Sequence, residues 1–450
     1  MCAFRIINTR SIRPVTLVFS KGIFRPSANM SSGVHLRLLP SSKCLFNEPI
    51  RIKIEGLSPG QSVELRARLT DDKSVTFKSS GTYRADPRGE IDLDNHPSLG
   101  GSYSGVEPMG LFWSLIPETP HEKLWKRDVL SPCFVDIEVH DGVRQGHVLA
   151  RETNERGFMA EGLRRIPVKE GRIRGTLFLP PGPGPFPGIV QMHTLGGGLS
   201  EVNGCLLANH GFVVLSLAFY SYQDLPKNVK KFDLEYFEEA IMFLRTLPEV
   251  KAPGVGILSI SKSGDLALSM ASFLSGVSAT VCVNGCSANV MVPLHYRDMV
   301  IPSLRTDLNK VRTTESGVLD VSDVLPDPMA PENQACLIPI ERANCKFLFA
   351  VSGDDGNWKS CYYAEQMTKR LKDHGKDNPE VVVYPKAGHF LEVPYMPHCA
   401  TSRHAAAGNA VVAFGGDPKA HAEAQVDLWN RIPAFFRKHL DNNMYREAKL

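Results

Sequence analysis

A serine-rich pentapeptide is the strongest candidate for a nucleophile in this chain. Residues 259–263 read Ser-Ile-Ser-Lys-Ser, after an apolar run and before a helical pattern. A nucleophile elbow places its serine at such a strand-to-helix turn, with small residues two before and two after it because strand and helix approach closely. Only Ser261 meets this condition, with Ser259 and Ser263 on its two sides. The competing interpretation is a serine-rich helix N-cap.

An aspartate pair and a histidine follow, each just past a predicted strand. The strand at 346–351 runs into Asp354 and Asp355, and the strand at 381–384 runs into His389. The carboxyl ends of strands in an open α/β sheet are where sites assemble, and the order serine, aspartate, histidine is that of the α/β-hydrolases. It predicts a triad in which the histidine is the base and an aspartate orients it. Spacing leaves the choice of aspartate open, and turn aspartates with a loop histidine are the competing interpretation.

Acyl transfer to a serine also needs two backbone N–H groups that stabilise the negative oxygen. We expect the first from Lys262, directly after the nucleophile, and the second from Gly196, in the glycine-rich loop after the strand at 188–192. A phosphate-binding loop at 196–198 is the competing interpretation, but the segment lacks the Gly-Lys-Ser/Thr ending of a P-loop.

No metal or organic cofactor is expected. The ten cysteines are scattered without paired Cys-x₂-Cys elements, so a structural zinc site is not indicated.

The elements that must position these residues fall into two parts. From 31 to 165, short runs alternate apolar and polar residues, as at 63–69 and 134–139, and turn residues separate them. This period of two predicts an all-β, immunoglobulin-like sandwich domain. No constellation of titratable residues stands out in this part.

After residue 166, continuous apolar strands alternate with helical patterns. Helix 233–247 has apolar residues at steps of three and four and is ended by Pro248, and a closing helix is expected at 421–440. Such alternation indicates a mostly parallel sheet with helices on both faces. The predicted class is α/β, with an α/β-hydrolase catalytic domain at 166–445.

The positive charge of the chain is concentrated at its beginning. Over 450 residues, 51 Lys and Arg face 48 Asp and Glu, for a net charge of +3. Residues 1–29 hold five basic residues and no acidic one, so the remainder, with 46 basic and 48 acidic residues, has a net charge of −2. A general nucleic-acid surface is therefore not indicated. The Arg-rich, acid-free composition predicts a transit peptide and the mitochondrial matrix, with a disordered leader as the alternative.

The last three residues predict a different cellular compartment. Residues 448–450 read Ala-Lys-Leu, a conservative variant of the Ser-Lys-Leu peroxisomal address. Peroxisome and cytosol are therefore the alternatives to mitochondria, and Met30 could serve as an internal start. No apolar run approaches the ~18 residues of a transmembrane helix, so no membrane span is predicted.

Several stretches resemble the type I acyl-CoA thioesterases, which share a family with the bile acid-CoA:amino acid N-acyltransferases. The resemblance covers about residues 38 to 440. It is most specific at Glu-Pro-Met-Gly-Leu (107–111), Arg-Gly-Thr-Leu-Phe-Leu-Pro-Pro (174–181), Asp-Asp-Gly-Asn-Trp-Lys-Ser (354–360) and Gly-His (388–389). It implies a sandwich domain, an α/β-hydrolase domain, and hydrolysis of fatty acyl-CoA to fatty acid and CoA through an acyl-serine intermediate.

The resemblance also implies the site residues. The family's nucleophile, acid and base fall on Ser261, Asp355 and His389, so the second aspartate of the pair is the acid. Two departures stand out: both elbow glycines are serine here, and the loop after the strand at 188–192 reads Met-His-Thr-Leu where the family usually carries Phe-Gly. Two alternatives remain, acyl transfer to glycine or taurine and a non-catalytic acyl-CoA binding protein. The transferase branch typically uses cysteine, so the serine favours water as the acceptor.

Overall fold

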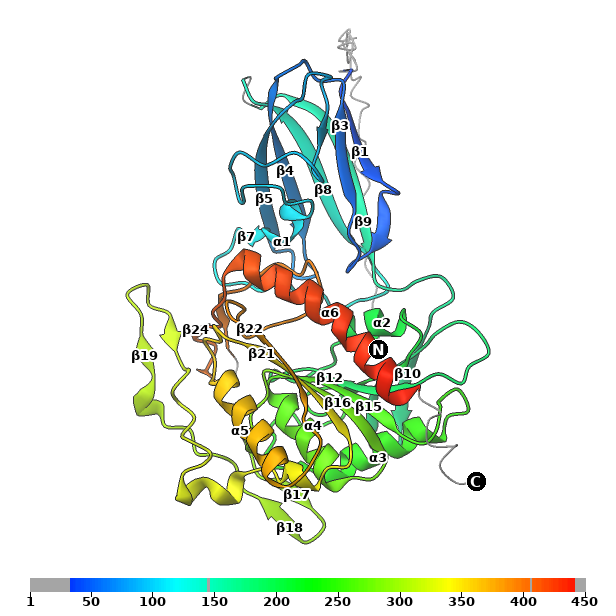
Figure 1. The fold of residues 1–450 in the computed structure, drawn as a ribbon, viewed down its shortest axis with the longest axis vertical. Helices are drawn as coiled ribbons and strands as arrows, with labels where there is room; N and C mark the ends of the chain where they lie inside the picture. The colour runs from blue at the N-terminus through cyan, green and yellow to red at the C-terminus, as the bar shows by residue number, and fades with distance from the viewer. Residues whose placement is uncertain (1–32, 144–145, 405–406, 442–450) are drawn as a thin grey trace, which may run out of the picture.

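The alternating segments of the N-terminal third form a two-sheet sandwich. The computed structural model describes residues 33–143, 146–404 and 407–441, so the predicted leader (1–29) and tripeptide (448–450) lie outside the described residues. One sheet has the strand order β1-β3-β6 and the other β2-β9-β8-β4-β5-β7 (Figure 1). The elements are β1 (His35–Leu39), β2 (Lys43–Leu45), β3 (Arg51–Glu55), β4 (Ser62–Thr70), β5 (Thr76–Arg84), β6 (Ile91–Asp92), α1 (Gly110–Trp113), β7 (Ile116–Pro117), β8 (Cys133–Asp141) and β9 (Val148–Gly157).

The strand β4 shows how the period of two makes a sandwich. Val63, Leu65, Ala67 and Leu69 are buried, while Arg66 and Arg68 between them are exposed. Successive side chains of a strand point to opposite faces, so one face of the sheet becomes the inside of the sandwich. The predicted β-sandwich is confirmed.

The second part of the chain is built on an eight-stranded sheet in the order β10-β11-β13-β12-β15-β16-β21-β22. The six strands from β13 to β22 run parallel, and β10 and β11 form an antiparallel edge. The central strands are buried throughout, as a sheet covered on both faces requires. The strands are β10 (Arg164–Glu170), β11 (Ile173–Leu179), β12 (Gly188–Met192), β13 (Val213–Ala218), β15 (Val255–Ile260), β16 (Val277–Val283), β21 (Lys346–Ser352) and β22 (Glu380–Tyr384).

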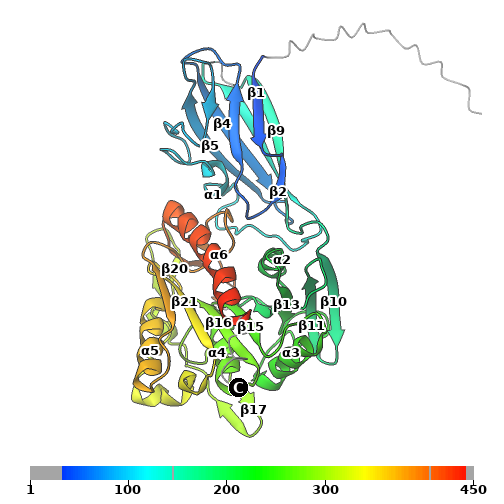
Figure 2. The ribbon, with the colours of Figure 1, turned by 45° about the vertical axis from the view of Figure 1, so that its right-hand side comes forward.

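Helices cover both faces of this sheet, as the sequence pattern predicts (Figures 1 and 2). Helices α3 (Leu234–Thr246), α4 (Lys262–Phe273) and α5 (Ser360–Asp373) pack on one face. Helices α2 (Val202–Ala208) and α6 (Pro418–Leu440) pack on the face toward the sandwich. The mostly parallel, doubly covered sheet confirms the α/β-hydrolase class. The predicted division between residues 165 and 166 falls within β10, and the domain bounds stay a prediction.

Short elements occupy the connections. Two small sheets have the orders β14-β17-β18 and β19-β20-β24-β23. They consist of β14 (Phe232–Asp233), β17 (Leu294–Tyr296), β18 (Met299–Ile301), β19 (Arg312–Thr313), β20 (Leu319–Asp320), β23 (Thr401–Arg403) and β24 (Val411–Ala413), and 3₁₀ turns lie at Leu308–Lys310, Pro331–Cys336 and Ile340–Arg342. Among the helices of the described ranges, none is both long and apolar enough to cross a bilayer.

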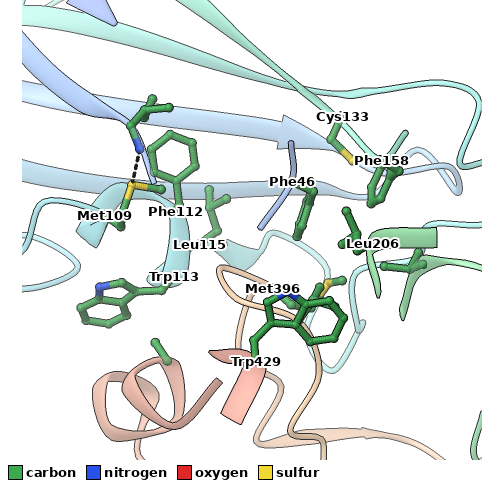
Figure 3. Close-up of a cluster of buried hydrophobic side chains, with 14 of the residues drawn as sticks. Phe46, Met109, Phe112, Trp113, Leu115, Cys133, Phe158, Leu206, Met396 and Trp429 are labelled. Atoms are coloured by element: carbon green, nitrogen blue, oxygen red, sulfur yellow. Dashed lines mark hydrogen bonds between the residues drawn. The ribbon is translucent and has the colours of Figure 1, made fainter. Parts of the chain in front are cut away.

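One buried apolar cluster runs from the sandwich into the second part of the chain. Phe46 and Phe112 of the sandwich, Leu206 of α2 and Trp429 of α6 belong to it (Figure 3). Burial of apolar surface contributes about 25 cal/mol per Å², so this contact stabilises the arrangement of the two parts. The sandwich is therefore packed against α2 and α6, and a linker is not its sole connection to the second part of the chain.

Arg156 is buried at this junction and is held by oxygen atoms and aromatic rings. Its guanidinium donates hydrogen bonds to the carbonyl oxygens of Phe46 (2.6 Å) and Glu48 (2.5 Å) and to Asn154 Oδ1 (2.9 Å). It also lies 5.6 Å from the ring centre of Tyr395, which belongs to the second part of the chain. A buried charge is tolerated where such donors are satisfied.

A close approach between α4 and the end of β16 gives a test of the fold. A Cβ on Gly264 would lie 2.7 Å from Gly285 Cα and 3.0 Å from Cys282 Sγ. We expect Gly264→Val to lower the free energy of unfolding by about 1–3 kcal/mol or more, because overpacking forces the backbone to shift. Urea denaturation measures this. Gly33→Ala, where nothing lies within 4 Å, is the control, and equal stability of both variants would contradict the packing.

Candidate active site

Ser261 sits at a strained turn between β15 and α4. Its φ of 59° and ψ of −126° are unusual for a residue with a side chain. The neighbouring β16 holds the turn, because Ser261 N–H donates to Val283 O (2.8 Å), and Gly264 N–H donates to Ser261 O (2.7 Å). Such strain persists only where the surroundings enforce it, and it is the geometry of a nucleophile elbow.

The two flanking serines are accommodated by hydrogen bonds to nearby backbone. Ser259 Oγ donates to Val281 O (2.9 Å), and Ser263 Oγ lies 3.2 Å from Met192 O. Both side chains are buried. Serine therefore fits where the elbow usually has glycine, since each hydroxyl finds an acceptor on an adjacent strand.

The structure brings the three residues expected to form a triad into one line of hydrogen bonds. His389 Nε2 lies 2.8 Å from Ser261 Oγ, and His389 Nδ1 lies 2.8 Å from Asp355 Oδ2. A carboxylate can only accept, so Nδ1 carries the proton and the unprotonated Nε2 accepts the serine hydroxyl. Ser261 and His389 are 5% and 1% exposed, so the reacting atoms are shielded from water.

The carboxylate of Asp355 is held by further donors besides the histidine. Its Oδ1 accepts from the backbone N–H groups of Asn357 (2.8 Å) and Trp358 (3.2 Å), and its Oδ2 accepts from Ser360 Oγ (2.5 Å). Asp354 lies elsewhere, since its Oδ2 accepts from Gly416 N–H (3.0 Å). Of the two aspartates, Asp355 alone contacts the histidine.

Hydrogen bonds fix the backbone of His389 to two residues that directly follow strands, Phe414 after β24 and Asn284 after β16. Its N–H donates to Phe414 O (2.8 Å), and its carbonyl accepts from Asn284 Nδ2 (2.7 Å). Asn284, directly after β16, also donates to Ser352 Oγ (2.9 Å), which in turn donates to Gly388 O (2.7 Å). The ends of β16 and β21 are thereby tied to the histidine.

A second histidine, His421 of α6, bridges the two residues beside His389. Gly388 N–H donates to His421 Nδ1 (3.0 Å), so the proton of this ring is on Nε2, which donates to Phe390 O (3.0 Å). Burial lowers the pKa of His421 to about 3. The ring is therefore neutral at pH 7 and keeps its acceptor.

Aromatic rings surround the His389 imidazole. Trp358 meets it edge-on with ring centres 5.4 Å apart, and Phe414 stacks at 6.0 Å. The indole is itself fixed, because Trp358 Nε1 donates to Asn284 O (2.8 Å). These contacts leave the imidazole little freedom to rotate away from Ser261.

Sequence reasoning missed the residues that support the triad. One usable signal existed: Asn284 and Ser352 stand at the carboxyl ends of two parallel strands, the edge where site residues gather. His421 carried no such signal, because it lies within α6 and reaches the site only through the packing of that helix. Among the described residues, no group of three or more His, Cys, Asp or Glu side chains is arranged to hold a metal ion.

The two predicted oxyanion donors differ in their present contacts. Lys262 begins α4, so its N–H has no acceptor within the helix. Its ammonium is buried and donates to Asp265 Oδ2 (2.5 Å) and Val290 O (2.8 Å), which anchors the residue. Gly196 N–H instead donates to Tyr220 Oη (2.6 Å). Gly196 could meet an oxyanion only if this hydrogen bond is exchanged.

Comparison with known proteins shows that the chain is similar to acyl-CoA thioesterases. Residues 47–170 match the family described as acyl-CoA thioester hydrolase/BAAT N-terminal region, and residues 232–442 match BAAT/acyl-CoA thioester hydrolase C terminal. The chain is 50% identical to human acyl-coenzyme A thioesterase 2, mitochondrial, over 93% of this chain and 86% of the relative. It is also 50% identical to human acyl-coenzyme A thioesterase 1, over 90% of this chain and 96% of the relative.

Among solved structures, the likeness is weak. A Mycobacterium tuberculosis puromycin-hydrolyzing peptidase aligns with a TM-score of 0.42 and 13% identity, over 91% of this chain and 68% of that one.

The neutral His421 predicts how stability depends on pH. The unfolded chain protonates this residue near 6.5 and the folded chain only near 3, so the unfolded state binds more protons between these values. Its contribution to stability is present above pH 6.5 and is lost as the pH falls toward 3, with a slope of at most about 1.4 kcal/mol per pH unit.

Denaturation of the wild type and His421→Gln between pH 7 and pH 4 measures this slope. We expect the variant to be less stable at pH 7 and to lose less stability on acidification. His374→Gln, which replaces an exposed histidine directly after α5, is the control and should leave the stability at pH 7 close to that of the wild type. Identical slopes in the wild type and His421→Gln would contradict the neutral bridge.

Proposed function

The chain belongs to the acyl-CoA thioester hydrolase/BAAT family and is an acyl-CoA thioesterase, and we propose that Ser261, His389 and Asp355 catalyse its hydrolysis of acyl-CoA to a fatty acid and CoA. The observation that carries this proposal is the unbroken line of two 2.8 Å hydrogen bonds that joins the three side chains. The strained elbow supports it, because it presents the hydroxyl at the carboxyl edge of the sheet.

In the first half of the reaction, Ser261 Oγ attacks the thioester carbonyl while His389 Nε2 takes the hydroxyl proton. The imidazolium formed is stabilised by the Asp355 carboxylate, whose remaining donors keep it in place. When the carbon–sulfur bond breaks, His389 returns the proton to the departing CoA sulfur. The acyl group is then an ester of the serine.

In the second half, a water molecule takes the place of the thiol. His389 removes a proton from the water as it attacks the acyl-serine carbonyl, and then protonates Ser261 Oγ as the ester breaks. The products are the free acid and the original enzyme. His389 carries each proton that moves, so no further group has to supply or accept an atom.

The negative oxygen formed in each half would be stabilised at the start of α4. Lys262 N–H points out of the first turn of this 12-residue helix, where the helix dipole also favours negative charge. The Lys262 ammonium on Asp265 and Val290 O holds the residue, and so its N–H, in position. Gly196 is our candidate for the second donor, after its hydrogen bond to Tyr220 is exchanged.

Substitution of the nucleophile tests the proposal. We expect Ser261→Ala to lower kcat by several orders of magnitude, because removing one triad member removes most of the catalysis that the triad performs together. The assay measures free thiol released from a panel of acyl-CoA esters, from short to very long chains and bile acyl. Ser259→Ala is the matched control, since this serine lies two residues away and its hydroxyl donates to Val281 O.

Three outcomes would contradict the proposal. Turnover retained in Ser261→Ala would remove the serine from the mechanism. A folded wild type that releases no thiol from any ester would indicate a binding protein. Conjugate formation faster than acid release, with glycine or taurine present, would indicate acyl transfer.

We also propose a mitochondrial destination. It is supported by the Arg-rich, acid-free segment 1–29, which lies outside the described residues, and by a relative whose name includes mitochondrial. We expect the full chain with an internal tag to enter mitochondria, and a chain starting at Met30 not to. Both forms in the cytosol, or the full chain in peroxisomes, would contradict this, and microscopy with organelle markers distinguishes the cases.

A further inference from the structure

A short loop of the sandwich region reaches across to the segment that carries His389. Its two ends are pinned within the sandwich: Glu118 N–H donates to Thr76 O (2.8 Å), and Trp125 N–H donates to Asp71 Oδ2 (2.9 Å). Residues 119–124, here called the strap, lie between these anchors. They leave the sandwich and contact the second part of the chain.

The strap makes four polar contacts with the segment after His389, one of which pairs Glu122 with Arg403 (3.8 Å). Lys123 Nζ forms an ion pair with Glu392 (2.7 Å) and lies 4.0 Å above the ring centre of Phe390. His121 Nδ1 lies 2.8 Å from Thr401 Oγ1. The single cation Lys123 therefore engages two residues that lie one and three positions after the histidine.

These two residues are coupled directly to the histidine. The rings of His389 and Phe390 lie 5.3 Å apart, and the Phe390 ring also lies 4.5 Å from that of Phe414, whose carbonyl accepts the His389 N–H. Glu392 N–H donates to Phe390 O (3.0 Å), so the backbone forms a tight turn here. A shift of Lys123 would move this turn and the imidazole with it.

The ion pair is partly buried, so it is more than a surface contact. The Lys123 and Glu392 side chains are 21% and 8% exposed. Removing one partner of a buried pair leaves the other charge uncompensated, which is strongly unfavourable. The neighbouring segment must then rearrange to let water reach that charge.

The same pair lies close to the predicted oxyanion loop. His193, the first residue after β12, has a pKa lowered to about 4, by burial first and then by the positive charge of Lys123, while Glu392 opposes the change. The imidazole of His193 is thus neutral at pH 7. The charges of Lys123 and Glu392 therefore act on His193 as well as on the segment 389–393.

We propose that the strap is a positioning element of the active site, in which Lys123 of the sandwich region holds the segment 389–393 so that His389 faces Ser261. This inference rests on the proposed function and deepens it. It assigns the sandwich region a part in the reaction: the region fixes the position of the catalytic base. Lys123 is a positioning residue, since it acts through Phe390 and Glu392.

Substitution of Lys123 tests the inference. We expect Lys123→Met to lower kcat for acyl-CoA about 10- to 100-fold, with little change in KM, because small displacements of a catalytic group carry penalties of this size. Lys123→Arg keeps the cation and should restore most of kcat. Glu392→Gln, which keeps volume and removes the charge, should lower kcat in the same way and gives a second route if Lys123→Met fails to fold.

A matched control separates this effect from a general loss of contact. Lys419 and Glu107 form another ion pair (2.5 Å) between α6 and the sandwich region, and this pair does not include a residue of the segment 389–393. Lys419→Met should leave kcat unchanged. Thermal unfolding of each variant shows whether the fold is intact.

A small reagent separates positioning from binding of the anionic CoA. A fluorophosphonate reacts with a histidine-activated serine and carries no CoA. We expect Lys123→Met to slow phosphonylation of Ser261 by the same factor as kcat. An unchanged phosphonylation rate with a raised KM would overturn the inference and make Lys123 a CoA-binding residue, and unchanged kcat in a folded Lys123→Met would also overturn it. A wild type that is phosphonylated but does not cleave acyl-CoA would instead refute the proposed function.

Discussion

The structure depends above all on holding one imidazole in one orientation. His389 presents Nε2 to Ser261 Oγ at 2.8 Å while its other nitrogen donates to Asp355. A histidine at the tip of a loop would sample many orientations, at a cost in conformational entropy each time it returned. Here its backbone is tied to Asn284 and Phe414, and its ring is enclosed by aromatic side chains. The backbone and ring of His389 are ordered when the chain folds, so the site is preorganised.

The same principle explains the strained serine. The positive φ of Ser261 costs free energy of order 1–3 kcal/mol, which the neighbouring strands and α4 must offset. The hydroxyls of Ser259 and Ser263 contribute by bonding to backbone that passes close to the elbow. The replacement of glycine by serine therefore keeps the geometry, and it adds hydrogen bonds at two positions where glycine has none.

The sandwich region is joined to this site by a continuous core and by polar contacts. The apolar cluster around Phe46 and Trp429 fixes the distance between the two parts. Arg156 and the strap then reach, through Tyr395 and Glu392, the segment that follows His389. The sequence of the sandwich region shows no titratable groups of evident function. This region nevertheless helps to shape the site through its packing.

The amino-acid sequence by itself determined the two-part architecture, the mostly parallel sheet and the identity of Ser261 and His389 as candidates. These follow from hydrophobic period, turn residues and chain order, all of which are local. Spacing along the chain left the choice of aspartate open and the family resemblance implied Asp355, which is the one that contacts the histidine in the structure. Only the tertiary structure decided that Gly196 N–H is bonded to Tyr220, and that Asn284, His421 and the strap hold the segment. Each of these contacts joins residues that are distant along the chain, or depends on backbone direction within a turn, and local patterns carry no information on either.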